Sequence, residues 1–360
     1  MISGGGTGGH IYPAIAIGQE LKAALDNVEL LFVGAKGKME MQKVPEAGFE
    51  IVGLWISGLQ RKLTIQNLLF PFKLISSIWK SFRLLRSFKP HVVVGVGGYA
   101  SGPLLFAASV KKIPTLIQEQ NSYAGLTNKL LSKRVNVVCV AHEGLETYFP
   151  NAKVIVTGNP VRKTITSSND QKMMALDHFG LQAGKKTILI IGGSLGARTI
   201  NEAILANLDE LLAADLQLIW QTGGFYYDEM IRRTEDKQQV GVSIQAFIAN
   251  MKYAYQAADI VVSRSGALSL AELMLTAKPC ILIPSPNVAE DHQNKNAKAL
   301  EERNAAIVID DNRAIEDLKE VVVKTLNSPD KLKSLQTNIS KMSRPNAAMD
   351  IANEIIRLVA

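Results

Sequence analysis

Residues 3–13 read SGGGTGGHIYP, so six residues, five of them glycine, separate Ser3 from His10. A helix that begins directly after glycines presents unpaired backbone N–H groups and a partial positive charge, and both features bind phosphate. Glycine also lets a ligand approach the backbone where a Cβ atom would clash. The stretch therefore predicts a ligand-binding turn that opens a helix, with a titratable side chain at its end.

The spacing of Gly4, Gly6 and Gly9 formally satisfies the dinucleotide-binding fingerprint G-x-G-x-x-G. That fingerprint also needs an acidic residue at the end of the second strand to hold a ribose, but GAK follows the apolar run LLFV. NAD binding is therefore not favoured. Tight turns without a ligand explain one such loop easily, but they explain poorly a set of three that includes GVGGYASGP and GGSLGAR.

Apolar runs that are followed by glycine and then by a helical pattern recur along the chain. They are VELLFVG, HVVVGVGG, KVIVTGNP, KTILIIGGS, LQLIWQTGG, ADIVVSRSG and PCILIPSP. Continuous apolar strands that alternate with helices are typical of parallel sheets covered on both faces, so the predicted fold class is α/β. Glycine loops occur in both halves, and GNPVRKTITSSND interrupts the pattern, which predicts two doubly wound domains.

Composition limits the function classes. The net charge is +7, and residues 1–159 carry 17 basic against 9 acidic side chains, so the excess lies in the first half and indicates an acidic partner there. Cys139 and Cys280 lie far apart in apolar runs, which favours reduced core thiols in a cytoplasmic protein. Glycines and a proline break the longest uncharged stretch, residues 90–110, so we expect no membrane span. The chain is hydrophobic enough to exclude disorder.

The second half contains a more complete nucleotide site. GGSLGAR follows ILII, and SRSGALSLAEL follows DIVV, which puts Glu272 in the first turns of the next helix. A carboxylate there either favours the helix dipole or accepts both hydroxyls of a ribose. The two glycine loops at neighbouring strand ends favour the second interpretation.

Several motifs together resemble the MurG glycosyltransferase family. They are GGGTGGHIYP, GVGGYASGP, QEQN, GNPVR, GGSLGAR, SGALSLAE and DHQNKNA, in the order and spacing of that family over almost the whole chain. The resemblance implies a GT-B architecture of two Rossmann-like domains facing across a cleft. It places an acceptor-binding, membrane-associating domain at 1–159, a UDP-sugar domain at 160–343, and a last helix, 344–360, back on the first domain.

The resemblance implies inverting transfer of N-acetylglucosamine from UDP-N-acetylglucosamine to the 4-hydroxyl of lipid I, a muramyl-pentapeptide diphospho-undecaprenol. It further implies that the product is lipid II and that the enzyme is peripheral on the cytoplasmic face of the plasma membrane. Its donor contacts fall on Arg162, Ser194, Ile248, Leu268, Glu272, Gln293 and Asn294. Its acceptor-side positions are Thr7, Gly8, Gly9, Tyr99, Ser101 and Asn121.

An inverting transfer needs a base for the attacking hydroxyl and positive potential for the leaving diphosphate. His10 is the favoured base because its ordinary pKa lies near neutral pH, and Glu119 is its rival or its orienting partner. Arg162 and the helix that begins after GGSLG both favour the negative charge that develops on the leaving diphosphate. The chain has no D-x-D motif, so we expect transfer without a metal ion and without a cofactor.

The sequence departs from the family in three places. Gln118 stands where histidine usually precedes EQN, and a glutamine cannot act as a base. Asn294 replaces the second of two glutamines found in some members, a shorter amide beside the sugar. Only residues 1–3 precede the glycine loop, so the strand under this loop is either very short or lacks residues through the choice of start site.

Residues 67–90, NLLFPFKLISSIWKSFRLLRSFKP, combine apolar and basic side chains without an acid. Ile75, Ile78, Trp79, Phe82 and Leu85 form a helical stripe beside Lys73, Lys80 and Arg83. Most such stripes are core faces, but this one also resembles an interfacial membrane surface, so we expect a shared role on anionic lipid. Nucleic acid is not expected as a partner, because the basic residues alternate with Ile, Leu, Phe and Pro.

Two other functions remain open from the sequence. A UDP-N-acetylglucosamine 2-epimerase shares the architecture and the donor, but it has no lipid acceptor, so the basic apolar segment, GGYASGP and QEQN argue against it. A non-catalytic UDP-sugar-binding subunit that recruits a partner to the membrane is the alternative outside enzymes. The presence of both acceptor-side and donor-side motifs in one chain argues against this alternative.

Overall fold

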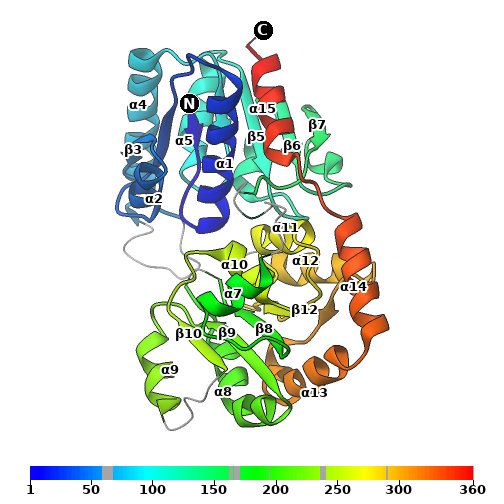
Figure 1. The fold of residues 1–360 in the computed structure, drawn as a ribbon. Coiled ribbons are helices and arrows are strands. Elements are labelled where there is room, and N and C mark those ends of the chain that lie inside the picture. The colour runs from blue at the N-terminus through cyan, green and yellow to red at the C-terminus, as the bar shows by residue number, and fades with distance from the viewer. Residues whose placement is uncertain are drawn as a thin grey trace. The chain divides into compact units, whose positions relative to one another are not determined.

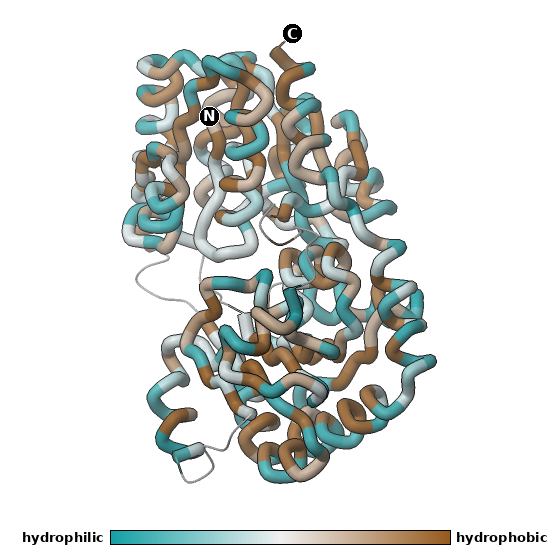
Figure 2. Tube along the Cα trace, in the orientation of Figure 1, coloured by the Kyte–Doolittle hydropathy of each residue, from teal (hydrophilic) through white to brown (hydrophobic). Residues whose placement is uncertain are grey.

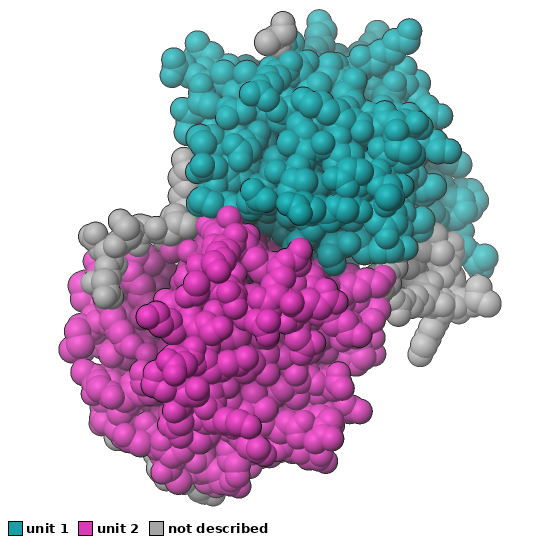
Figure 3. Space-filling model, turned by 90° about the vertical axis from the view of Figure 1, so that its right-hand side faces the viewer, with its two compact units in different colours: residues 1–162, 344–360 teal, residues 163–343 magenta. Residues whose placement is uncertain are grey.

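The computed structural model describes residues 1–58, 68–161, 165, 171–193, 195–235, 241–288 and 291–359. The chain divides into two compact units (Figure 3). Unit 1 comprises residues 1–162 and 344–360, and unit 2 comprises residues 163–343. Each unit is an α/β layer structure around one parallel sheet (Figure 1).

Unit 1 is built on a seven-stranded parallel sheet with the order β3-β2-β1-β4-β5-β6-β7. Its strands are β1 (Ile2–Ser3), β2 (Leu31–Ala35), β3 (Glu50–Leu54), β4 (Val93–Gly95), β5 (Thr115–Glu119), β6 (Val137–Val140) and β7 (Lys153–Val156). Every residue of β2, β5 and β6 is buried, as expected for strands covered on both faces. The strand order reverses direction between β1 and β4, so the loops after these two strands lie side by side at the carboxyl edge of the sheet.

Two layers of helices cover the sheet of unit 1. The helices are α1 (Gly8–Ala24), α2 (Glu40–Glu46), α4 (Phe70–Phe88), α5 (Ser101–Val110), α6 (Leu126–Leu131) and α15 (Ala347–Arg357). One core contains Leu85 of α4, Leu104 of α5 and Leu131 of α6. The other contains Ile11 of α1 and Ile351 of α15, so a helix from the end of the sequence packs beside the first helix (Figure 1).

Unit 2 has a six-stranded parallel sheet with the order β10-β9-β8-β11-β12-β13. The strands are β8 (Lys186–Ile191), β9 (Leu216–Gln221), β10 (Val242–Gln245), β11 (Ile260–Ser263), β12 (Cys280–Leu282) and β13 (Ile307–Val308). The order reverses between β8 and β11, which again brings two loops together at the carboxyl edge.

The helices of unit 2 pack on its sheet through their apolar faces. They are α7 (Lys172–His178), α8 (Arg198–Ala213), α9 (Tyr227–Arg233), α10 (Met251–Ala257), α11 (Ala267–Leu275), α12 (His292–Glu301), α13 (Ala314–Leu326) and α14 (Pro329–Lys341). In Figure 2, α13 and α14 alternate between hydrophobic and hydrophilic residues. The buried members include Leu318, Val322, Leu335 and Ile339, which follow helical spacing.

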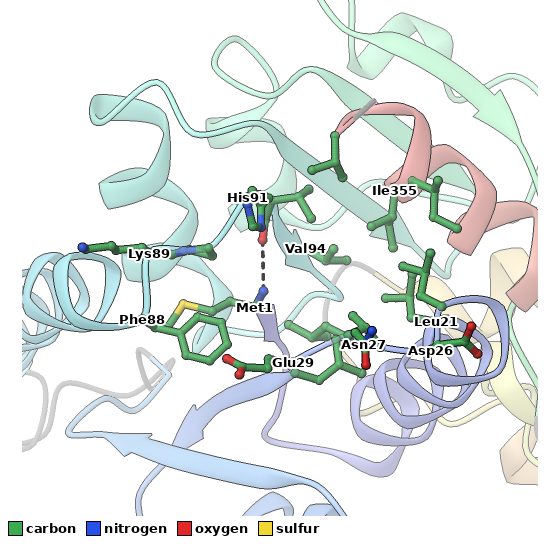
Figure 4. Close-up of a pocket in the computed structure, with 18 residues that line it drawn as sticks. Met1, Leu21, Asp26, Asn27, Glu29, Phe88, Lys89, His91, Val94 and Ile355 are labelled. Atoms are coloured by element: carbon green, nitrogen blue, oxygen red, sulfur yellow. Dashed lines mark hydrogen bonds between the residues drawn. The ribbon is translucent and has the colours of Figure 1, made fainter.

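A cavity of about 700 Å³ lies at the amino edge of the unit 1 sheet, away from the glycine loops (Figure 4). Leu21, Phe88 and Ile355 are among its apolar walls. The α-amino group of Met1 donates to Val92 O at 3.0 Å, and burial lowers the pKa of this amine to about 5. Because ligands of such sheets bind at the carboxyl edge, this cavity is separate from the candidate site.

The two cysteines are free thiols in the interior. Cys139 lies in β6 and Cys280 in β12, and burial raises the pKa of each thiol to about 12. Among the helices of the described ranges, none has the length and hydropathy that a bilayer span requires.

Candidate active site

The first glycine loop joins β1 to α1 and ends at His10. Thr7 is the N-cap of α1, with extended dihedral angles, and its carbonyl accepts hydrogen bonds from His10 N at 3.1 Å and Ile11 N at 3.2 Å. The Thr7 side chain makes no capping hydrogen bond to the helix backbone. It bonds the imidazole, since Thr7 Oγ1 lies 3.1 Å from His10 Nδ1. Gly8 and Gly9 form the first turn of α1, so the predicted residues of this loop lie together.

A buried glutamate that the sequence analysis missed holds this loop. Glu40, in the first turn of α2, accepts hydrogen bonds from Gly6 N at 3.2 Å to both carboxylate oxygens and from Ala35 N at 2.9 Å. A Cβ atom on Gly5 would lie 2.2 Å from Glu40 Oε1, and one on Gly34 would lie 2.5 Å from its Cγ. The glycines at these positions therefore make room for a carboxylate of the protein, and Gly6 N is not available to a phosphate.

The loop after β4 packs tightly against the first loop. Gly97 and Gly98 have φ angles of +89° and +77°, and a Cβ atom on Gly98 would lie 2.3 Å from Gly5 O. A Cβ atom on Gly97 would lie 2.8 Å from His10 Cδ2. Both glycines are therefore required for the imidazole of His10 to lie against this loop.

Tyr99 and Ser101 follow these glycines. The Tyr99 ring covers Gly6, since a Cβ atom there would lie 3.0 Å from Tyr99 Cε1. Partial burial, with a smaller contribution from the charge of Glu40, raises the pKa of the Tyr99 hydroxyl. Ser101 is buried and donates to Gly98 O at 2.9 Å, so it stabilises the turn from inside.

Glu119 ends β5, and it is 1% exposed. One carboxylate oxygen accepts hydrogen bonds from Asn121 N at 3.1 Å and Asn121 Nδ2 at 3.3 Å. The other accepts from Gly125 N at 2.9 Å and Asn128 Nδ2 at 2.8 Å. Four donors on the following loop and α6 hold this carboxylate, an arrangement that orients Asn121 and favours a positioning role.

Amide side chains connect the ends of β5 and β7. Gln118, which replaces the family's usual histidine, donates to Asn159 Oδ1 at 3.0 Å. Asn159 donates to Gln120 O at 2.9 Å, and Gln120 donates to Val96 O at 2.6 Å. This buried network connects the chain segments that follow β4, β5 and β7.

In unit 2, the loops after β8 and β9 contact each other through glycine. A Cβ atom on Gly196 would lie 2.1 Å from Thr222 O, and one on Gly223 would lie 2.4 Å from Gly196 N. Asn201 of α8 holds the second loop, because it donates to Thr222 O at 2.9 Å. Of the predicted donor residues, Ser194 and Arg162 lie outside the described residues.

Glu272 lies on α11 and is nearly buried. It accepts a hydrogen bond from the hydroxyl of Tyr255 on α10 at 2.9 Å. Leu268, one turn earlier on α11, is half-buried. The predicted ribose residue thus lies in the second turn of the helix that follows β11, with its carboxylate bonded to α10.

Three other donor positions belong to neighbouring loops of the same edge. Ile248 is buried, and its N–H donates to Gln221 Oε1 at 3.3 Å. Gln293, in the first turn of α12, accepts from Ser285 N at 2.9 Å. Asn294 donates to Asp291 Oδ1 at 2.5 Å. Within the described ranges, no group of three His, Cys, Asp or Glu side chains has the arrangement of a metal site.

Two family models match most of the chain, and relatives match all of it. The model "Glycosyltransferase family 28 N-terminal domain" matches residues 1–140, and "Glycosyltransferase family 28 C-terminal domain" matches residues 187–354. A UDP-N-acetylglucosamine–N-acetylmuramyl-(pentapeptide) pyrophosphoryl-undecaprenol N-acetylglucosamine transferase from Flavobacterium psychrophilum is 54% identical, with 100% of this chain and 97% of the relative covered. The chain belongs to the MurG transferases of glycosyltransferase family 28. A transferase of the same description from Cytophaga hutchinsonii is 51% identical over 100% of this chain and 96% of its own.

Solved structures identify the fold as GT-B. The crystal structure of Acinetobacter baumannii MurG has 27% identity and a TM-score of 0.76, with 99% of both chains covered. A UDP-GlcNAc 2-epimerase from Neisseria meningitidis bound to UDP-GlcNAc is similar in fold, with 15% identity, a TM-score of 0.67 and 99% of both chains covered. The predicted fold class and family are confirmed, and the likeness to the epimerase concerns the fold alone.

Proposed function

We propose that this chain transfers N-acetylglucosamine from UDP-N-acetylglucosamine to lipid I and so forms lipid II for peptidoglycan synthesis. The observation that carries this proposal is 54% identity, over the whole chain, to a transferase of that description. The glycine loops at the carboxyl edges of both sheets support it, because ligands of such sheets bind at that edge.

In the proposed reaction, the acceptor's 4-hydroxyl oxygen forms a bond to the anomeric carbon as the bond from that carbon to UDP breaks. The electron pair of the broken bond leaves with UDP, and the hydroxyl proton passes to the base. His10 is the proposed base because its imidazole is half-buried at the end of a loop, with Nδ1 beside an exposed threonine. The amino end of α8 and Arg162 would stabilise the leaving diphosphate.

The reaction is tested with labelled UDP-N-acetylglucosamine and a lipid I analogue, with and without EDTA. We expect a lipid-linked disaccharide in both conditions, because the proposed stabilisation of the diphosphate uses a helix end and a guanidinium. Activity that disappears with EDTA and returns with Mg²⁺ or Mn²⁺ would contradict the metal-free mechanism. A free 2-epimer without disaccharide would favour the epimerase.

We propose that Glu272 binds the ribose, with Tyr255 holding its carboxylate. Glu272→Ala is expected to weaken UDP binding about tenfold or more, since a hydrogen bond to a charged group contributes roughly 1.5–3 kcal/mol. Titration calorimetry with UDP measures the change. The control is Glu301→Ala, which removes an exposed glutamate from a helix of the same unit. Equal affinity of Glu272→Ala and the wild type would remove Glu272 from the site.

The acceptor site is proposed to include Thr7, Tyr99, Ser101 and Asn121 around His10. Because the donor belongs to unit 2, His10→Ala is expected to leave UDP affinity nearly unchanged and to slow turnover about a hundredfold or more, the usual contribution of a positioned base.

Glu119→Gln is the comparison variant for His10→Ala, and thermal unfolding of both variants controls for loss of structure. If Glu119→Gln remained stable but lost more activity than His10→Ala, the base would be Glu119. His10 would then be a structural residue of its loop.

Unit 1 is also proposed to bind an anionic membrane surface through α4, as a peripheral protein on the cytoplasmic face. The sequence stripe divides in the structure, since Leu85 is buried and Phe82 packs on the core, whereas Ile75 and Trp79 are 66% and 62% exposed. The exposed stripe comprises Phe72, Ile75, Trp79, Arg83 and Arg86, at helical spacing.

The basic groups beside this stripe also differ in their surroundings. The guanidinium of Arg83 lies 4.0 Å from the centre of the Trp79 ring. Lys73 instead bonds Ser57 Oγ at 3.0 Å, and Lys80 bonds Gly53 O at 2.8 Å. Burial lowers the pKa of Lys80, and the charge of Lys36 adds to this effect. The two exposed arginines are therefore better placed than these lysines to contact lipid phosphates.

Two double variants test the membrane surface by sedimentation with anionic vesicles. Ile75→Ser with Trp79→Ser, and separately Arg83→Glu with Arg86→Glu, are each expected to reduce vesicle binding with UDP affinity unchanged. Each basic residue near such a surface contributes about 1 kcal/mol, and high salt should weaken binding further.

The control for charge is Lys331→Glu with Lys333→Glu, on α14 of unit 2, where both lysines are exposed. Unchanged sedimentation of both α4 variants would assign this face to another partner.

A further inference from the structure

Gln120 is a buried side chain with one unused hydrogen-bonding atom. Its residue is 3% exposed, and among the described residues its Oε1 has no hydrogen-bond partner. A buried acceptor without a partner costs about 1–3 kcal/mol, so this atom calls for an explanation.

The orientation of the Gln120 amide is determined by its other end. Gln120 Nε2 donates to Val96 O at 2.6 Å and also to Gln118 Oε1. Turning the amide over would set its oxygen against these two acceptors, so the amide stays as it is. Gln120 Oε1 therefore keeps one orientation, and as an amide oxygen it can only accept a hydrogen bond.

That oxygen faces the same small space as the imidazole of His10. A Cβ atom on Gly97 would lie 3.1 Å from His10 Nε2 and 3.3 Å from Gln120 Oε1. Gly97 is buried and has no side chain, so nothing from this residue fills the space between the two atoms. The imidazole Nε2 is thus a potential donor beside the unused acceptor.

The two edges of the imidazole have different surroundings. Nδ1 lies beside Thr7, which is exposed, and near Gly98, which is half-buried, whereas Nε2 lies beside Gly97 and Gln120, which are buried. Nδ1 is therefore the nitrogen that a substrate hydroxyl would meet first. For Nδ1 to accept a proton, the neutral imidazole must carry its proton on Nε2, and Nε2–H then needs a buried acceptor.

We propose that Gln120 is a positioning residue that accepts a hydrogen bond from Nε2–H of His10 and so presents Nδ1 as the base. During transfer the proton of the acceptor hydroxyl moves to Nδ1, and Gln120 Oε1 holds Nε2–H of the resulting imidazolium. This inference rests on the proposed role of His10.

Other titratable groups on the surrounding elements are Glu40, Tyr99 and Glu119. The Glu40 carboxylate is bonded to Gly6 N and Ala35 N, and that of Glu119 is bonded to its own loop and α6. The Tyr99 ring packs on Gly6. Of these groups, Gln120 is therefore the one whose hydrogen bond to His10 depends most directly on which imidazole nitrogen carries the proton.

Gln120→Leu and Gln120→Glu separate this role from a structural one. Leucine has a similar volume but no amide, so it removes the acceptor and also the bonds to Val96 O and Gln118 Oε1. We expect kcat to fall roughly tenfold or more, with KM for UDP-N-acetylglucosamine unchanged. The pKa of His10 should fall, because the imidazolium loses its acceptor, and the acid limb of the kcat profile should move to lower pH. Glutamate keeps an acceptor toward His10 and adds negative charge, so the acid limb should move to higher pH. Its second oxygen meets Val96 O and Gln118 Oε1, so thermal unfolding of this variant controls for lost stability.

Two controls accompany these variants. In a His10→Ala background, Gln120→Leu should have no further effect on kcat, since the two residues act as one unit. Gln217→Leu removes another buried glutamine, from unit 2, and it controls for a loss of stability alone. An equal loss of kcat in the presence and absence of His10, or an unchanged pH profile, would overturn the proposal.

Nitrogen NMR of ¹⁵N-histidine-labelled protein tests the hydrogen bond without the reaction. The chain has five histidines, and His10→Ala assigns the signal. We expect a proton on Nε2 of neutral His10 in the wild type and a shift of that signal in Gln120→Leu. A proton on Nδ1, unaffected by Gln120→Leu, would refute the inference even in an active transferase. The expected NMR result in a protein without transferase activity would uphold the hydrogen bond and refute the proposed function.

Discussion

The approach of two glycine loops at the carboxyl edge of the unit 1 sheet is the constraint on which the candidate site depends. β1 and β4 are neighbours in the sheet, with Ser3 opposite Gly95, so the loops that follow them have little room to separate. Gly98 touches the backbone of Gly5 where a Cβ atom would overlap it, and Gly97 touches the imidazole of His10. A side chain at either glycine would displace His10 from the edge of the sheet. The histidine is therefore positioned by the backbone contact as much as by its own helix.

Buried carboxylates and amides hold this contact in place. Glu40 takes the N–H groups of Gly6 and Ala35, and Glu119 takes four donors of the loop that follows it. Hydrogen bonds to a carboxylate are stronger than those between neutral groups, so these loops are rigid before any ligand arrives. Preorganised loops of this kind suit a reaction in which charge moves from a hydroxyl to a diphosphate.

The sequence predicted those parts of the structure that follow from local pattern. The continuous apolar runs became parallel strands, buried except in β7, and each glycine loop lies at the carboxyl edge where β1, β4 and β8 end. The role of Glu40 was not predicted, because a lone acid in an amphipathic helix gives no sign of the backbone groups that it will meet. The signal lay elsewhere, in Gly5 and Gly34, whose missing side chains make room for it. The stripe on α4 was predicted only in part, since periodicity does not distinguish the half of a helix that faces the core from the half that faces solvent.

The path of the chain has a consequence for synthesis. The core beneath α1 includes Ile351 and Ile355 of α15, but all of unit 2 lies between α15 and the rest of unit 1 in the sequence. On a ribosome, unit 2 is complete in sequence before the last helix of unit 1 emerges, and until then the face of α1 that α15 covers is bare. Domains generally fold as units during synthesis, in order from the amino terminus. Here that order is reversed for the final step, because the core of unit 1, which is made first, is completed last, when α15 packs on α1. A chain interrupted near its end therefore exposes apolar surface in unit 1, while unit 2 has its full sequence.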